Sequence, residues 1–203
     1  RTVLAGLGAA GLGACTAPFQ IGEGKKPPKG GIGGTGIVGT LTDFGSLIVN
    51  GLRVETGPDT VISDAFGETS QDALKVGQVL TIEAATSPER SDAALVARTV
   101  RINHPVIGPV QHVSVDGRRG VVAGVAVFLE EGAIGQLESG ARVAVSGVWR
   151  GQRVIASRID RLDPSGPVAL AGVLDARDGT TGRIAGIPVR TAGTPLPDAG
   201  SFV

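Results

Sequence analysis

Short runs of alternating apolar and polar residues, separated by glycine-containing turns, recur along the chain from Gly36 onward. This alternation has the period of half-buried β-strands. Between the second and third runs stands Asn50-Gly51, a dipeptide typical of two-residue type I′ hairpin turns, in which both residues adopt positive φ. A polar connection follows the third run. The segments expected to form strands, with the turn that opens the fourth, are 36–42, 46–49, 52–55, 74–83 and 95–102.

The same order of elements returns twice further along the chain. Ala123-Gly124 and Ala185-Gly186 take the place of Asn50-Gly51, so Asn50, Gly51, Gly124 and Gly186 are expected to form structural turns. The glycine that opens the fourth strand also repeats, with 63 residues from Gly77 to Gly140 and 60 from Gly140 to Gly200. A period of this length predicts several small units instead of one large domain.

Five strands in about 60 residues, with an interruption after the third, predict a small barrel of the OB type. The fold class expected is therefore all-β, with tandem small five-stranded OB-like barrels, two complete and a third truncated, after a flexible N-terminal tether. The expected boundaries are a partial signal peptide at 1–14, a lipidated cysteine and tether at 15–35, and barrel units at 36–103, 104–166 and 167–203.

Three local motifs connect the first unit to a known family. They are Gly-Ile-Gly-Gly-Thr-Gly-Ile-Val-Gly at 31–39, Val-Asn-Gly-Leu-Arg-Val-Glu-Thr at 49–56 and Leu-Lys-Val-Gly-Gln-Val at 74–79. In these motifs the chain resembles domain of unknown function 5666, a bacterial family of tandem OB-like repeats in envelope lipoproteins, over roughly 31–203. The resemblance implies the fold and an envelope location. It supplies no catalytic residue, because none is established for the family.

The N-terminal residues are typical of a targeting signal and not of a folded domain. One basic residue, an apolar segment and small residues before a break are typical of a secretory signal. Leu12-Gly13-Ala14-Cys15 resembles the lipobox of bacterial lipoproteins, which implies acylation of Cys15 and a membrane anchor. The alternative is an apolar N-terminal helix with a buried thiol. Export by the Sec or the Tat route stays open, and Thr16 favours an outer-membrane or periplasm-facing location.

The chain carries no net charge, with 19 basic and 19 acidic side chains, so no global field attracts nucleic acid. The charges are unevenly distributed. Residues 36–97 hold three basic and nine acidic side chains, whereas residues 98–190 hold twelve arginines and eight acids. This asymmetry either orients neighbouring units and partners or is ordinary solvated surface.

The candidate ligand-binding residues lie in the second unit. Four arginines lie there near its single tryptophan, Trp149. They are Arg118, Arg119, Arg150 and Arg153. OB barrels bind glycans and oligonucleotides on their second and third strands. Proteins that bind nucleic acid by stacking its bases normally carry several aromatic side chains for this purpose. This unit offers only Trp149 and Phe128, which argues against a nucleic-acid partner.

The sequence shows no constellation for catalysis, a metal or a cofactor. His104 and His112, eight residues apart across a proline-containing junction, lack metal-pair spacing. The function expected is that of a non-enzymatic, lipid-anchored envelope protein whose barrels bind or scaffold other envelope proteins or glycans. The alternative is a glycan- or nucleic-acid-binding OB protein that uses the Arg/Trp surface of the second unit.

Overall fold

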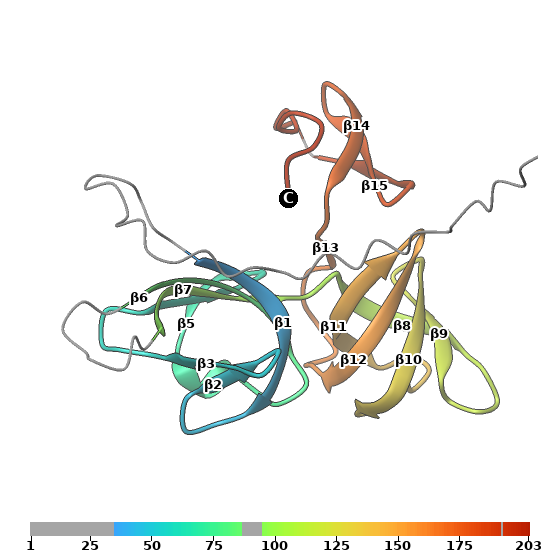
Figure 1. Cartoon of the computed structure of the whole chain (residues 1–203). Helices are drawn as coiled ribbons and strands as arrows, with labels where there is room; N and C mark the ends of the chain where they lie inside the picture. The colour runs from blue at the N-terminus through green and yellow to red at the C-terminus, as the bar shows by residue number, and fades with distance from the viewer. Residues whose placement is uncertain (1–34, 87–94, 192) are drawn as a thin grey trace, which may run out of the picture. The chain divides into compact units, whose positions relative to one another are not determined.

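The computed structural model describes residues 35–86, 95–191 and 193–203. The expected signal peptide, Cys15 and almost all of the tether lie outside the described residues. The described residues form β-strands joined by turns, with one short 3-10 helix. They build two closed five-stranded barrels and a third, partial sheet, so the predicted fold class is confirmed (Figure 1).

The first barrel is a ring of five strands. Its strands are β1 (Thr35–Asp43), β2 (Leu47–Val49), β3 (Leu52–Glu55), β6 (Val79–Thr86) and β7 (Leu95–Asn103). Around the ring the order is β3-β2-β1-β6-β7, and β3 closes it by pairing with β7 in parallel. A five-stranded ring closed by one parallel pair has the OB-like arrangement that the strand count predicted, and closure leaves the ring no free strand edge.

The polar connection between the third and fourth strands of the ring contains a hairpin that the sequence did not predict. It consists of β4 (Val61–Asp64) and β5 (Gly67–Thr69), followed by the 3-10 helix η1 (Gln71–Ala73). β4 pairs in parallel with β7, and of its residues only Ile62 is buried, with 6% of its surface exposed. One buried residue in β4 and none in β5 is too little alternation to detect in a sequence, so only the pairing with β7 defines this hairpin.

The second barrel repeats the first. Its strands are β8 (Val106–Val113), β9 (Arg119–Val122), β10 (Val125–Ile134), β11 (Arg142–Arg150) and β12 (Arg153–Arg161). The ring order is β11-β12-β10-β9-β8, closed by β11 against β8, and its parallel pair is β10 with β12. The short strand β13 (Ala169–Leu170) adds to β8 outside the ring.

The third sheet contains the first three strands of the same plan. It consists of β14 (Leu174–Asp178), β15 (Thr181–Ile184) and β16 (Ile187–Arg190), paired in that order. Val173 forms a bridge with Phe202, and Gly172 and Val203 exchange backbone hydrogen bonds of 2.9 and 3.0 Å. Residues 201–203 therefore start along β14 as the fourth ring strand does in each barrel.

One pair of backbone contacts recurs in all three units. A glycine with positive φ donates its N–H to the carbonyl of an apolar residue in the first strand, at 2.8 Å each time. The glycine and carbonyl partners are Gly77 with Leu41, Gly140 with Val110, and Gly200 with Leu174. In each unit the first strand also has a register shift directly after that apolar residue. The three units thus share one backbone geometry, as the glycine spacing predicted.

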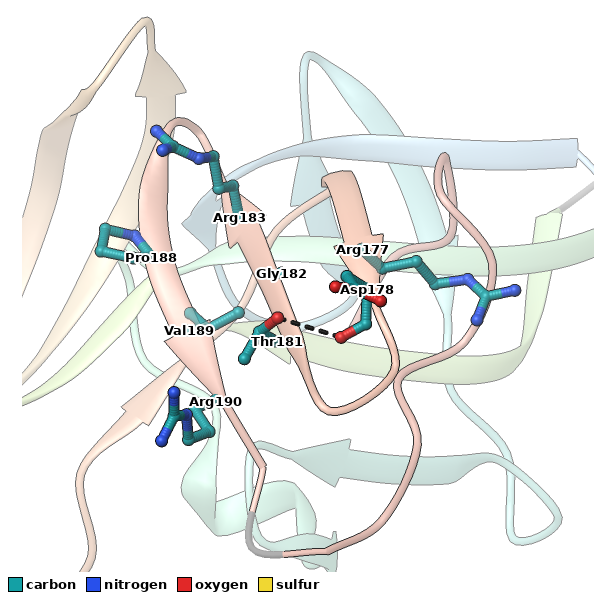
Figure 2. A pocket seen from close by; sticks show the side chains of 8 residues that line it. All are labelled: Arg177, Asp178, Thr181, Gly182, Arg183, Pro188, Val189 and Arg190. Carbon is teal, nitrogen blue, oxygen red and sulfur yellow. Dashed lines mark hydrogen bonds between the residues drawn. The ribbon is translucent and has the colours of Figure 1, made fainter.

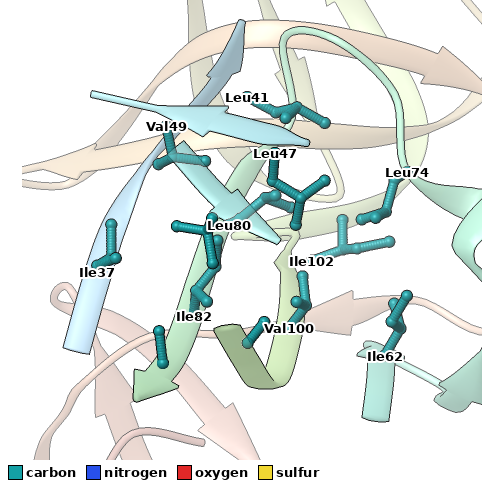
Figure 3. Close-up of a cluster of buried hydrophobic side chains, with 13 residues drawn as sticks. Ile37, Leu41, Leu47, Val49, Ile62, Leu74, Leu80, Ile82, Val100 and Ile102 are labelled. Carbon is teal, nitrogen blue, oxygen red and sulfur yellow. The ribbon is translucent and has the colours of Figure 1, made fainter. Parts of the chain in front are cut away.

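The apolar residues of the first barrel converge on one interior cluster. Leu41, Leu80 and Ile82 are fully buried within it, and Figure 3 shows the side chains of the cluster gathered between the strands. Burial of a leucine or isoleucine side chain stabilises the folded state by about 1.5–3 kcal/mol. Because this core contains no aromatic residue, its volume depends on branched aliphatic side chains.

Replacing Gly51 tests the turn that joins β2 and β3. Asn50 and Gly51 adopt φ of 51° and 75°, as the type I′ prediction requires. A Cβ at Gly51 meets no atom within 4 Å, so Gly51→Val introduces backbone strain without a clash. We expect a loss of about 1–2 kcal/mol in the free energy of unfolding, measured by hydrogen exchange of the first-barrel amides under increasing denaturant. The matched control is Gly57→Val, where the space is equally open and φ is not positive. Equal protection in both variants would contradict the turn assignment.

Candidate functional site

The outer face of the second barrel brings together an aromatic ring and three arginines. Phe128 on β10 lies directly opposite Arg119 on β9, and Arg153 on β12 lies opposite Arg150 on β11. The Arg153 guanidinium stands 5.2 Å from the centre of the Phe128 ring, within the range of a cation–π contact. We refer to Arg119, Phe128, Arg150 and Arg153 as the Arg–Phe face.

Strand alternation explains why these side chains face outward. Val127 and Val154, the neighbours of Phe128 and Arg153 along their strands, are fully buried in the barrel core. Successive side chains in a strand point to opposite faces of the sheet. The Arg–Phe face is therefore the solvent side of β9, β10, β12 and the end of β11, with Phe128 half-buried and the three arginines exposed.

Trp149 lies on the opposite side of the sheet from these arginines. It pairs with the buried Val154 and packs against the cores of both the second barrel and the third sheet. Its indole N–H donates to the Ala171 carbonyl at 2.8 Å. Four of the five candidate residues are thus exposed, whereas the half-buried tryptophan joins two units and faces away from Arg150.

Two of the basic residues are held near the β8–β9 turn. The Arg118 guanidinium donates to the Leu129 carbonyl at 3.2 Å, and Arg119 forms an exposed ion pair with Asp116 at 3.6 Å. Hydrogen bonds from the Ser114 hydroxyl and then the Arg118 N–H lower the pKa of Asp116. An exposed pair of this kind contributes little to stability, so Arg119 can exchange Asp116 for another anion at low cost.

A second constellation, which the sequence did not predict, joins the first two barrels. Ser157 is the extra residue of a β-bulge in β12, where the pairing steps from Ser146–Arg158 to Gly147–Ala156. Its buried hydroxyl donates to the Gly77 carbonyl of the first barrel at 2.7 Å. The adjacent Arg158 donates to the Val76 carbonyl at 2.9 Å. The residues involved are 80 or more positions apart in the chain, which no local pattern reveals.

The Asp160 carboxylate, which pairs with Arg158 and Lys75, lies next to these hydrogen bonds. Arg158 contacts both carboxylate oxygens of Asp160, at 2.7–2.9 Å, and Lys75 reaches the same carboxylate at 3.2 Å. Burial alone would raise the pKa of Asp160, but the hydrogen bond and charge of Arg158, with the Lys75 charge, lower it overall. The carboxylate therefore stays ionised between the barrels and fixes the Arg158 side chain.

His104 is buried at the same junction. Its Nδ1 lies 3.3 Å from the Ser146 hydroxyl oxygen, and only 8% of its surface is exposed. Burial lowers the pKa of His104, although Asp64, Asp160 and a hydrogen bond with the Val145 backbone act in the opposite direction. Ser146 is fully buried, so its hydroxyl is inaccessible to a substrate, and the contact serves packing and not nucleophilic attack.

Within the described ranges, no group of three or more His, Cys, Asp or Glu side chains has an arrangement that could hold a metal ion. The same part of the chain has no helix with the length and apolar character needed to cross a bilayer.

Comparison with known families gives a match for the first barrel. The family model described as Domain of unknown function (DUF5666) matches residues 35–101, which run from β1 almost to the end of β7. The resemblance predicted from the sequence motifs is thus confirmed for this unit, about a third of the chain. No curated protein and no solved structure matches the chain. The likeness of the second and third units to the first rests on the recurring sequence pattern and on the structure, and not on the family match.

Protonation of His104 is expected to weaken the junction at acid pH. Because the pKa of His104 is lowered from 6.5 in the folded protein, the unfolded chain binds the proton more readily. The stabilisation is present above the unfolded pKa and is lost as the pH falls below about 6.5 towards the folded value. We expect the free energy of unfolding, measured by denaturant titration from pH 8 to about pH 5, to fall less in His104→Gln than in the unsubstituted chain.

The control for this titration is His112→Gln, since His112 is exposed and belongs to no such junction. The two variants have the same change in composition. A pH dependence that is equal in His104→Gln and the unsubstituted chain would show that His104 does not contribute to it.

Proposed function

We propose that this chain is a non-catalytic, lipid-anchored protein of the bacterial envelope whose tandem β-barrels act as binding or scaffolding modules. The observation that carries the proposal is the junction between the first two barrels. A scaffold has to hold its binding surfaces at a fixed separation, and the Ser157 hydroxyl, the Arg158 guanidinium and the Lys75–Asp160 ion pair tie these two barrels together.

The physical character of the junction suits a fixed spacer. Each hydrogen bond contributes about 0.5–1.5 kcal/mol net, and breaking a single one leaves a buried carbonyl or hydroxyl unsatisfied. Removing Arg158 would also leave the half-buried Asp160 without its main partner. The ion pair that crosses the junction is the one between Lys75 and Asp160, whereas Arg158 and Asp160 lie on the same strand. The junction thus supports a rigid pair of modules.

The envelope location rests on Cys15 and the residues before it. Diacylation or triacylation at this position would give stable membrane attachment, which one acyl chain does not. An outer-membrane or periplasm-facing site agrees with Thr16 after the cysteine.

A second candidate function is favoured by the Arg–Phe face. Its members Arg119 and Phe128 lie on the second and third strands of an OB-like ring, where such barrels bind polymers. Guanidinium groups pair with carboxylates, and the Phe128 ring supplies an apolar surface between Arg119 and Arg153. A single aromatic favours an acidic glycan over a single-stranded nucleic acid, which needs successive stacking platforms.

The anchor is tested by metabolic labelling with a fatty-acid analogue. We expect the unsubstituted protein to carry the label and Cys15→Ala to carry none, because the thiol is the acylated group. Thr16→Ala is the matched control, since it changes the neighbouring residue and retains the thiol. Absence of label from the unsubstituted protein, or equal label in Cys15→Ala, would refute the lipid anchor.

The second candidate is tested by calorimetric titration with an oligogalacturonide. We expect weak, salt-sensitive binding, reduced about tenfold in the double variant Arg119→Gln/Arg153→Gln, because hydrogen bonds to charged groups are the stronger class. Trp149 fluorescence should stay unchanged on binding, since the indole lies on the opposite side of the sheet.

Arg161→Gln serves as the control, because Arg161 is exposed at the end of the same strand and pairs with Glu138 at 2.7 Å. Tighter binding of oligothymidylate than of oligogalacturonide would instead favour a nucleic-acid function. Unchanged affinity in the double variant would remove the Arg–Phe face as the site.

A further inference from the structure

The third sheet carries an open pocket on its solvent face. The pocket has a volume of about 460 Å³ and is bordered by Arg177, Asp178, Thr181, Arg183, Pro188 and Arg190. Figure 2 shows Arg183 and Arg190 with Pro188 between them along the β15–β16 hairpin. Thr181 donates its hydroxyl to the Asp178 carbonyl at 2.9 Å, which closes the turn at one end of the pocket.

The strand register places the two arginines on one face. Arg183 lies opposite Pro188, and Arg190 lies opposite Thr181. Ile184, the residue after Arg183, is buried in the small core of this sheet, so Arg183 points away from that core. Arg183 and Arg190 are diagonal neighbours, and Cα atoms in such positions are about 7–8 Å apart.

This face corresponds to the Arg–Phe face of the second barrel. Counted from the second residue of each hairpin turn, Arg190 lies four residues after Gly186, as Phe128 lies four residues after Gly124. Thr181 takes the place of Arg119 by the same count. In the first barrel the position of Arg190 holds an acid, Glu55. At this position the third unit is therefore basic and the first acidic, although Arg53, two residues before Glu55, lies on the same outer face of β3.

The arginines of the pocket differ in the partners that they have. Arg177 forms an ion pair with Asp198 at 2.5 Å. Among the described residues, Arg183 and Arg190 take part in no ion pair, and the Arg183 guanidinium makes only a long 3.4 Å hydrogen bond to the Gly186 carbonyl. Asp178 is the single acid at the border. Two exposed guanidinium groups without a carboxylate partner favour an anionic ligand.

We propose that the outer face of β15 and β16 binds the carboxylates of an acidic glycan through Arg183 and Arg190. Guanidinium groups pair with carboxylates in a planar, two-point geometry, and two of them on diagonal positions suit charges that repeat along an extended chain. No aromatic side chain borders this pocket, so it provides no platform for base stacking. The site consists of other residues than the Arg–Phe face and functions without it.

The test isolates this site from the second barrel. The 203-residue chain carrying Arg119→Gln/Arg153→Gln is titrated with an oligogalacturonide in a calorimeter at low and at high salt. We expect binding to persist in this background, to weaken at high salt, and to fall about tenfold or more when Arg183→Gln/Arg190→Gln is added. Arg161→Gln in the same background should bind as the background does, because Arg161 lies on β12 outside this pocket and is already paired with Glu138.

Each other result overturns a defined part of the proposal. Loss of all binding in the starting background assigns the glycan to the Arg–Phe face and removes the third-sheet site. Persistent binding that Arg183→Gln/Arg190→Gln leaves unchanged removes it as well. Tighter binding of oligothymidylate overturns the glycan assignment. No binding by the unsubstituted chain rejects both glycan sites, whereas the lipid anchor is decided independently by the labelling of Cys15.

Discussion

The architecture depends on one backbone hydrogen bond that occurs three times. A glycine before the fourth ring strand donates its N–H to the first strand, and the positive φ of that glycine turns the chain back onto the sheet. In the two barrels this contact brings the fourth strand beside the first, after which the last strand can reach the third in parallel. The ring of strands is then closed and encloses a core of aliphatic side chains, since only 3% of the chain is aromatic.

Closure of the ring also determines which side chains are exposed to solvent. Once the ring register is set, Val127 and Val154 lie inside, so Phe128 and Arg153 lie outside. The same alternation turns Trp149 inward, where it packs between the second barrel and the third sheet. The equivalent face of the third sheet presents Arg183 and Arg190. One repeated register thus exposes a basic surface in two units while the first unit keeps an acid at the matching position.

The junction of the first two barrels shows how an irregularity in one strand becomes a contact with another unit. The bulge at Ser157 interrupts the ladder of β12 and frees a hydroxyl for the Gly77 carbonyl. Gly77 belongs to the contact that closes the first barrel, so closure of one unit and attachment of the next share a residue. Ionised Asp160 and neutral, buried His104 lie beside it, which makes the arrangement sensitive to charge.

The sequence by itself determined the features that depend on neighbouring residues. Strand alternation, the Asn50-Gly51 and Ala-Gly turns, and the spacing of Gly77, Gly140 and Gly200 predicted the barrels and their number, because turn geometry and side-chain period are local properties. Only the tertiary structure decided the β4–β5 hairpin, the inward position of Trp149 and the contact of Ser157 with Gly77. These arise from pairing between strands distant in the chain, where a shift of one residue exchanges buried and exposed side chains. No local pattern encodes that choice, since it is made by the packing of the closed ring.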